Sequence, residues 1–317
     1  MKIKLLQASI LSLSVIASSS IFAAPIIMEG DYVKTAVSDN GTLGFGGGTP
    51  PGILHDITGT GTFDPVKDYL TYGTPREIFS VYSTESGVKT NDNSSSSGSG
   101  GAIIKNSLSS ISSIYDNAVS WSGESSGFFN ITNDYFFNDG DERISMTSTI
   151  TALQDLTNLS FLRELDPDQD GFSGYTSTNN TRGYDANNDG DYIDAEDVAP
   201  EDFVHALGPI TGLTIGLFSD SIITHNTGVT SWSTSHSEYL TGNDIGDGDN
   251  TIGLAFNIGS LFSGSSVSFE YDYIMGENLA AAVTTATNVV PEPASLALLG
   301  LGLAGIGFMR KRKQAKV

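Results

Sequence analysis

The chain has 317 residues, with 15 Lys and Arg against 37 Asp and Glu, and it contains no Cys. The formal net charge of −22 argues against nucleic acid as a partner, because phosphate binding requires clustered basic side chains. The absence of Cys excludes disulfides, Cys-ligated metal centres and a Cys nucleophile. The charge is unevenly placed, since residues 24–291 hold eight basic and 36 acidic residues, a net charge of −28, between two basic ends.

The N-terminal segment has the three parts of a secretory signal peptide. Two lysines precede an apolar stretch that ends at Phe22, and the small residues Ala23 and Ala24 follow. We expect cleavage after Ala23 or Ala24 and favour Ala23, because Pro25 would follow a cut at Ala24, so residues 1–23 are the predicted signal peptide. An uncleaved membrane anchor is the alternative, but several Ser residues dilute the apolar stretch below the roughly 20 residues of a membrane span.

Residues 24–283 are expected to form an antiparallel β-sandwich or jelly roll. Apolar and polar residues alternate, which is the pattern of half-buried strands. The alternation is clearest in residues 144–151, 213–217, 252–258 and 267–273. The last two segments flank a Gly-containing turn and are predicted to form a hairpin. No helical stripe precedes Ala294, which indicates an all-β body, and residues 284–289 are predicted to be a linker.

Residues 161–200 form an acidic insertion that contains two segments with the spacing of calcium-binding loops. The first segment places carboxylates at positions 1, 3 and 5 and a Gly at position 6: Asp166, Asp168, Asp170 and Gly171. The second fits the whole twelve-residue pattern, with oxygen ligands predicted at Asp185, Asn187, Asp189, Asp191 and Glu196. Because calcium accepts about 6–8 hard oxygen ligands, we predict structural calcium in both loops, in place of the missing disulfides.

These two segments resemble EF-hand-like and dockerin-like calcium loops without the flanking helices. The first has Ser177, and not Glu, at position 12, and Pro200 cuts short any helix after the second. The departures argue against a true EF-hand, and a solvated acidic turn is the alternative interpretation of both loops. Residues 243–250 form a third acidic segment, whose spacing is less regular.

Three features follow one another in the C-terminal segment, residues 290–314. Val290, Pro291, Glu292 and Pro293 come first, an apolar run over 294–309 comes next, and a basic cluster closes the segment at Arg310, Lys311, Arg312 and Lys313. The run is just short of the roughly 17–25 residues of a spanning helix, and its glycines are tolerated there, so a transmembrane helix is predicted. The basic cluster should stay cytoplasmic.

This order of features resembles the PEP-CTERM sorting signal, which is also labelled the ice-binding protein C-terminal domain. The resemblance implies transient contact with an exosortase, a membrane protease-transpeptidase, in the inner membrane of a Gram-negative bacterium that makes exopolysaccharide. It then implies transfer to the cell surface or extracellular matrix. An ordinary tail anchor is the alternative. The resemblance covers only residues 288–314 and assigns no chemistry to the body.

The body shows no convincing catalytic motif. Residues 123–127 match G-x-S-x-G, but no helix follows, as a nucleophile elbow requires. The four His residues show no metal-ligand spacing. Trp121 and Trp232 could stack on sugar rings, although a core or strand-edge position explains them better. The sequence favours a structural or adhesive component of the cell surface or exopolysaccharide matrix. A matrix glycan hydrolase or lyase and an ice-binding adhesin are the alternatives.

Overall fold

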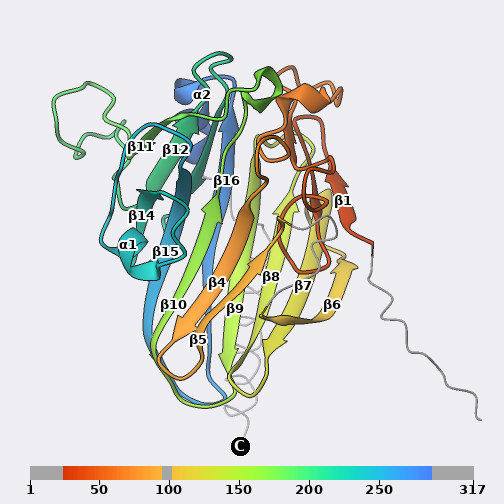
Figure 1. Cartoon of the computed structure of the whole chain (residues 1–317), viewed down its shortest axis with the longest axis vertical. Coiled ribbons are helices and arrows are strands. Elements are labelled where there is room, and N and C mark those ends of the chain that lie inside the picture. Colours follow the sequence, from red (N-terminus) through yellow and green to blue (C-terminus); the bar gives the residue numbers. More distant parts are fainter. Residues whose placement is uncertain (1–23, 95–101, 288–317) are drawn as a thin grey trace, which may run out of the picture.

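The computed structural model describes residues 24–94 and 102–287, which form a body built almost entirely of antiparallel strands (Figure 1). The predicted signal peptide and the predicted transmembrane helix over 294–309 lie outside the described residues. Within the described ranges, no helix is both long and apolar enough to cross a membrane. The all-β class predicted from the alternating pattern is confirmed.

The strands form three sheets. The small sheet has the order β1 (Ile26–Glu29), β2 (Val33–Val37), β3 (Ile53–His55). The five-stranded sheet has the order β14 (His225–Thr230), β15 (Thr251–Leu261), β10 (Leu156–Leu165), β4 (Glu77–Ser83), β5 (Gly87–Asp92). The eight-stranded sheet has the order β11 (Asn179–Arg182), β12 (Phe203–Leu207), β13 (Thr214–Phe218), β16 (Ser266–Gly276), β9 (Arg143–Ala152), β8 (Phe129–Phe137), β7 (Asn117–Ser125), β6 (Ile104–Ser110).

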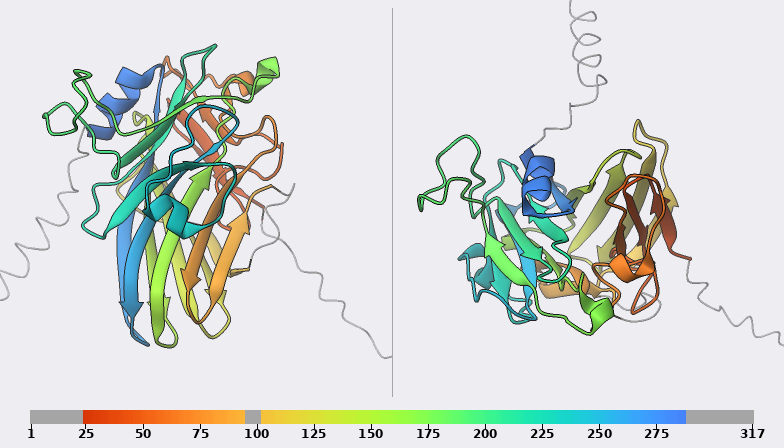
Figure 2. Two further views of the ribbon diagram at one scale, coloured as in Figure 1. Left: turned by 60° about the vertical axis from the view of Figure 1, so that its left-hand side comes forward. Right: turned by 90° about the horizontal axis from the view of Figure 1, so that it is seen from above.

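The two large sheets pack face to face, and the hydrophobic core fills the space between them (Figures 1 and 2). Strand β8 shows how the sequence produces this arrangement, because its residues alternate strictly between buried and half-buried positions. Phe161 of β10 meets Phe269 of β16 across the core, with ring centroids 5.1 Å apart. Burying one such ring contributes about 1.5–3 kcal/mol.

The connection between β15 and β16 differs from the sequence prediction. β15 pairs with β14 and β10 in the five-stranded sheet, whereas β16 pairs with β13 and β9 in the eight-stranded sheet. The predicted hairpin is therefore wrong, and the short connection between them crosses from one sheet to the other. Alternation shows which side of a strand is buried, but it does not show which sheet the strand joins.

Short helices lie outside the core: η1 (Pro65–Lys67), η2 (Gly171–Ser173), α1 (His236–Leu240) and α2 (Leu279–Thr287). α2 overlaps the linker predicted to begin at residue 284, and that part of the prediction is wrong. Its Ala-rich sequence favours a helix, and the side chain of Asn278 accepts a hydrogen bond from the N–H of Ala281, 3.0 Å away. Ala282, Val283 and Ala286 are buried where α2 contacts β13 and β16, so the helix is docked on the body.

Candidate functional site

The first predicted calcium loop begins directly after β10, at one end of the sandwich. The backbone N–H of Asp166 donates to the carbonyl of Arg76 over 2.9 Å, and that of Asp168 donates to the carbonyl of Tyr69 over 2.8 Å. These bonds hold the loop against the segment that leads into β4. Asp166 and Asp168 are each only 1 % exposed.

The carboxylates of Asp166 and Asp168 have no hydrogen-bond partner among the described residues for any of their four oxygens. Burial raises the pKa of Asp166 to about 9, and the nearby charges of Asp168 and Asp249 act in the same direction. Burial also raises the pKa of Asp168 to about 8, with a further contribution from Asp249. Buried carboxylates without partners are costly unless they take up protons or a cation. This pair therefore has the properties expected of cation ligands.

Two residues distant in sequence also lie close to the pair, in addition to Arg76 and Glu164, whose charges act on Asp166 in opposite directions. Gly73 has φ = +64°, and a Cβ atom there would lie 2.5 Å from the Oδ2 atom of Asp168, so the absence of a side chain makes room for this carboxylate. Asp249, in the third acidic segment, is exposed and accepts a hydrogen bond from the hydroxyl of Thr176 at 3.0 Å. No local motif signals Gly73, and the third acidic segment does not by itself show that Asp249 approaches this pair, because the topology of the fold brings both residues to this end of the sandwich.

Asp170, the third predicted ligand of the first loop, makes bonds of a different kind. Its carboxylate accepts hydrogen bonds from the N–H of Ile210 at 2.8 Å and from the N–H and hydroxyl of Thr211 at 3.2 and 2.6 Å. Both oxygens are thus occupied within the protein. In this structure Asp170 fixes the turn that joins β12 to β13.

The second predicted loop lies largely exposed and is folded on its own side chains. The carboxylate of Asp185 accepts the N–H groups of Asp189 and Gly190, at 3.3 and 2.9 Å. The amide of Asn187 donates to the carboxylates of Asp189 and Asp194, at 3.0 and 2.6 Å. Asp191 accepts the N–H of Ile193 at 3.2 Å, and Glu196 is exposed at position 12.

The structure supports calcium binding more strongly for the first loop than for the second. Over residues 24–94 and 102–287, no group of three or more acidic or His side chains is arranged so that it could hold a metal ion. The second loop therefore stays a prediction from spacing. In the first loop, the unpartnered pair of Asp166 and Asp168 is an independent sign of a ligand, which the sequence alone could not provide.

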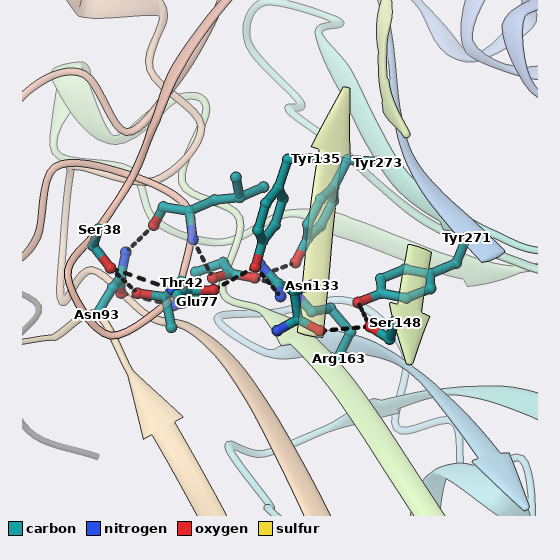
Figure 3. A network of polar contacts seen from close by, with 12 residues as sticks. Ser38, Thr42, Glu77, Asn93, Asn133, Tyr135, Ser148, Arg163, Tyr271 and Tyr273 are labelled. Atoms are coloured by element: carbon teal, nitrogen blue, oxygen red, sulfur yellow. Dashed lines mark hydrogen bonds and ion pairs between the residues drawn. The ribbon is translucent and has the colours of Figure 1, made fainter. Parts of the chain in front are cut away.

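A further polar cluster, which the sequence analysis missed, lies inside the core (Figure 3). Arg163 of β10 and Glu77 of β4 form an ion pair in which neither side chain is exposed. Glu77 also accepts the hydroxyl of Tyr273 at 2.9 Å and the N–H of Leu43 at 2.8 Å. This cluster joins the two sheets. Because it is fully enclosed, it cannot contact a substrate.

The structure also shows where the two Trp residues and the G-x-S-x-G match lie. Trp121 is fully buried, as the core interpretation expects. Ser125, at the centre of the G-x-S-x-G match, ends β7 and is followed by a turn and β8, so the strand–helix context of a nucleophile elbow is missing there. Trp232 is half-buried and lies beside Asp249.

The fold defines an antiparallel β-sandwich protein, and the C-terminal segment narrows the class further. Residues 289–313 match the PEP-CTERM protein-sorting motif. The chain therefore carries the sorting signal that its sequence resembles, and this signal implies export and a surface or extracellular location. No curated protein matches the chain in sequence.

Solved structures match the chain at low sequence identity. A bacterial glucoamylase in complex with acarbose has a TM-score of 0.53 and 14 % identity, over 85 % of this chain and 34 % of that chain. A putative kojibiose phosphorylase from the human microbiome has a TM-score of 0.39 and 10 % identity, over 88 % and 32 % of the two chains. This chain spans about a third of the length of both, and the likeness to the glucoamylase shows the fold alone.

Proposed function

We propose that the protein is an exosortase-sorted component of the cell surface or exopolysaccharide matrix, structural or adhesive in role, whose sandwich is stabilised by calcium. The sorting motif at residues 289–313 supports the location. The single observation that supports calcium is the pair of buried, unpartnered carboxylates of Asp166 and Asp168. Extracellular modules need only about 10⁻⁴–10⁻³ M affinity for calcium, which a site with few carboxylates can reach.

In this proposal, Asp166 and Asp168 bind the ion, and main-chain carbonyls and water complete its shell. Asp249 adds negative potential, and the carboxylate of Asp170 holds the loop in shape from the other side. The ion then joins the end of β10 to the segment around Gly73. It takes the place of a disulfide in a chain that has no Cys.

The enzymatic alternative, a matrix glycan hydrolase or lyase, has weaker support. Burial raises the pKa of Glu164 to about 7 and those of Asp166 and Asp168 higher, which are values seen at catalytic sites. All three side chains are nevertheless buried, so they do not face a substrate. At 14 % identity, the fold shared with the glucoamylase is no evidence that this chain has the activity of that enzyme.

The ice-binding alternative depends on exposed hydroxyl rows. Thr149 and Thr151 of β9 do face outward, but their hydroxyls are bonded to Ser268 and Ser266 of β16, each at 2.7 Å. Glu270 lies in the next row of β16 and places a charged group in the array. The hydroxyls on this sheet surface therefore already have hydrogen-bond partners within the sheet, which argues against an ice-binding row.

Thermal unfolding of the mature protein during calcium titration tests the proposal. Saturating calcium should stabilise it by about 1–3 kcal/mol, as mass action predicts for a ligand well above its Kd. D166N/D168N should reduce the response to the part that the second loop contributes, because neutral amides no longer attract the ion in the first loop. Calcium stabilisation would be ruled out if calcium changed neither the melting temperature nor the proteolysis of residues 161–200. Retention of full-length protein in the membrane fraction of a strain without exosortase tests the sorting.

A further inference from the structure

Four aromatic side chains stand at the end of the sandwich that carries Asp166 and Asp168, and we call them the aromatic rim: Tyr72, Phe172, Tyr175 and Trp232. Phe172 and Tyr175 are 42 % and 46 % exposed, and Tyr72 and Trp232 are half-buried. Exposed apolar side chains with polar groups around them are typical of an interaction surface.

Close contacts and hydrogen bonds connect the segments that carry the four rim residues. Tyr72 packs so closely on Gly171, beside Phe172, that a side chain at Gly171 would collide with it. Thr176, the neighbour of Tyr175, donates its hydroxyl to the carboxylate of Asp249. The indole N–H of Trp232 donates to the carbonyl of the same Asp249 over 3.3 Å. The rim residues thus lie on segments that adjoin the carboxylate pair and Asp249.

Trp232 is fixed in position before any ligand arrives. Its backbone has φ = +62°, a left-handed conformation that a bulky residue rarely adopts. The guanidinium of Arg76 lies 5.5 Å from the indole ring centroid and donates to the carbonyl of Trp232 over 3.3 Å, and Glu164 holds that guanidinium at 2.7 Å. Strained conformations that the surroundings enforce in this way cluster at ligand clamps.

We propose that the aromatic rim binds a neutral polysaccharide. This inference deepens the proposed function, on which it rests, by naming the partner of the matrix protein. The apolar faces of pyranose rings pack on aromatic rings, while Tyr and Trp also offer a polar edge for hydroxyls. The body carries a net charge of −28 and repels acidic chains, so a neutral glycan is the compatible ligand.

Calcium should strengthen this binding indirectly. Asp168 lies against Gly73, next to Tyr72, and its backbone accepts the N–H of Gly171, next to Phe172, over 2.8 Å. An ion at the carboxylate pair therefore fixes the spacing of at least two rim residues. Binding to a rim that is already ordered costs less conformational entropy.

Affinity electrophoresis of the full mature protein tests the proposal, with hydroxyethyl cellulose, dextran or galactomannan in the gel and alginate as the acidic comparison. At least one neutral polymer should retard the wild type, and F172A/Y175A should weaken that affinity at least tenfold. F262A is the matched control, because Phe262 is 69 % exposed and follows the end of β15 that pairs with Leu156, at the opposite end of β10 from Asp166. F262A should bind as the wild type does.

Three outcomes would overturn the proposal: no retardation by any of the neutral polymers, full retention of affinity in F172A/Y175A, or retardation by alginate alone. The calcium response of the melting temperature, measured on the same variants, keeps this result separate from the proposed function. F172A/Y175A should retain that response, which shows that the site beneath has folded. Retardation by a neutral polymer without any calcium response of the melting temperature would contradict calcium stabilisation but would still support glycan binding by the aromatic rim.

Discussion

Glu77 of β4 and Arg163 of β10 pair in the middle of the core, where both side chains are 0 % exposed (Figure 3). The guanidinium lies between the rings of Phe79, Tyr135 and Tyr273, at 5.6–5.9 Å from their centroids. Two charges removed from water carry a large desolvation cost, which their attraction offsets only while both partners remain. The pair therefore makes the packing of the two sheets sensitive to single changes.

Glu77→Gln should destabilise the protein by about 3–5 kcal/mol, because it leaves the guanidinium of Arg163 buried without a counter-charge. Urea unfolding followed by circular dichroism measures this loss. E29Q is the control, since Glu29 pairs with Lys34 on the surface at 2.7 Å and should contribute under about 1 kcal/mol. Equal effects of the two substitutions would show that the buried pair has no special role.

The contribution of His236 to stability should fall as the pH decreases from about 6.5 to about 4, because His236 resists protonation in the folded state. Its ring lies between the hydroxyls of Ser80 and Ser160, each at 2.8 Å, and burial lowers its pKa from 6.5 to about 4. The unfolded chain takes up the proton first, so this contribution is complete above pH 6.5 and declines by about 1.4 kcal/mol per pH unit below it. His205, whose pKa burial also lowers to about 4, adds a similar slope.

Unfolding free energies measured at several pH values check this, with His236→Asn expected to reduce the acid slope. His225 supplies a control of opposite sign. Burial opposes its charge, but its hydrogen bond with Asp202 at 3.0 Å raises its pKa, so its stabilisation is present at low pH and is lost as the pH rises. H225N should therefore leave the slope between pH 6.5 and 4 unchanged and reduce the loss of stability as the pH rises above 6.5. An unchanged slope in H236N would refute the role of His236.

The sequence predicted the strands well because one periodicity determines them. Alternation such as that in β8 and β9 follows directly from one buried and one outer face. The partner sheet of each strand depends on contacts distant in the sequence, which is why the β15–β16 hairpin was wrong. α2 was missed because its buried stripe consists mainly of Ala and is only weakly apolar.

The candidate site was predictable in part for the same reason. Asp166 and Asp168 follow from local spacing, which places successive acidic side chains of one loop close together. Spacing could not show that Asp170 meets the N–H groups of Ile210 and Thr211 instead. Nor could it show Gly73, which lies more than ninety residues before Asp166 in the sequence and touches Asp168 only through the fold.

The second loop should bind its own calcium ion, and D185N/D189N should remove it. The two carboxylates occupy positions 1 and 5, where calcium loops supply direct ligands. Equilibrium dialysis should find two ions per wild-type chain and one in D185N/D189N, because the pair of Asp166 and Asp168 remains. D139N is a control from an acidic turn without the complete pattern and should leave the count at two. A wild-type count of one would assign this loop to solvated acidic turns.

Gly73→Ala should destabilise the protein and weaken calcium binding, whereas Gly87→Ala should destabilise the protein without changing calcium binding. Both glycines have φ = +64°, so an Ala at either position costs about 1–2 kcal/mol of backbone strain. At Gly87 a Cβ atom meets nothing within 4 Å, but at Gly73 it meets Asp168 at 2.5 Å and must displace that carboxylate. The difference between the two variants isolates the contact. Calorimetric calcium titration should therefore show a Kd at least several-fold weaker in G73A and unchanged in G87A, and equal values would mean that Asp168 does not bind the ion.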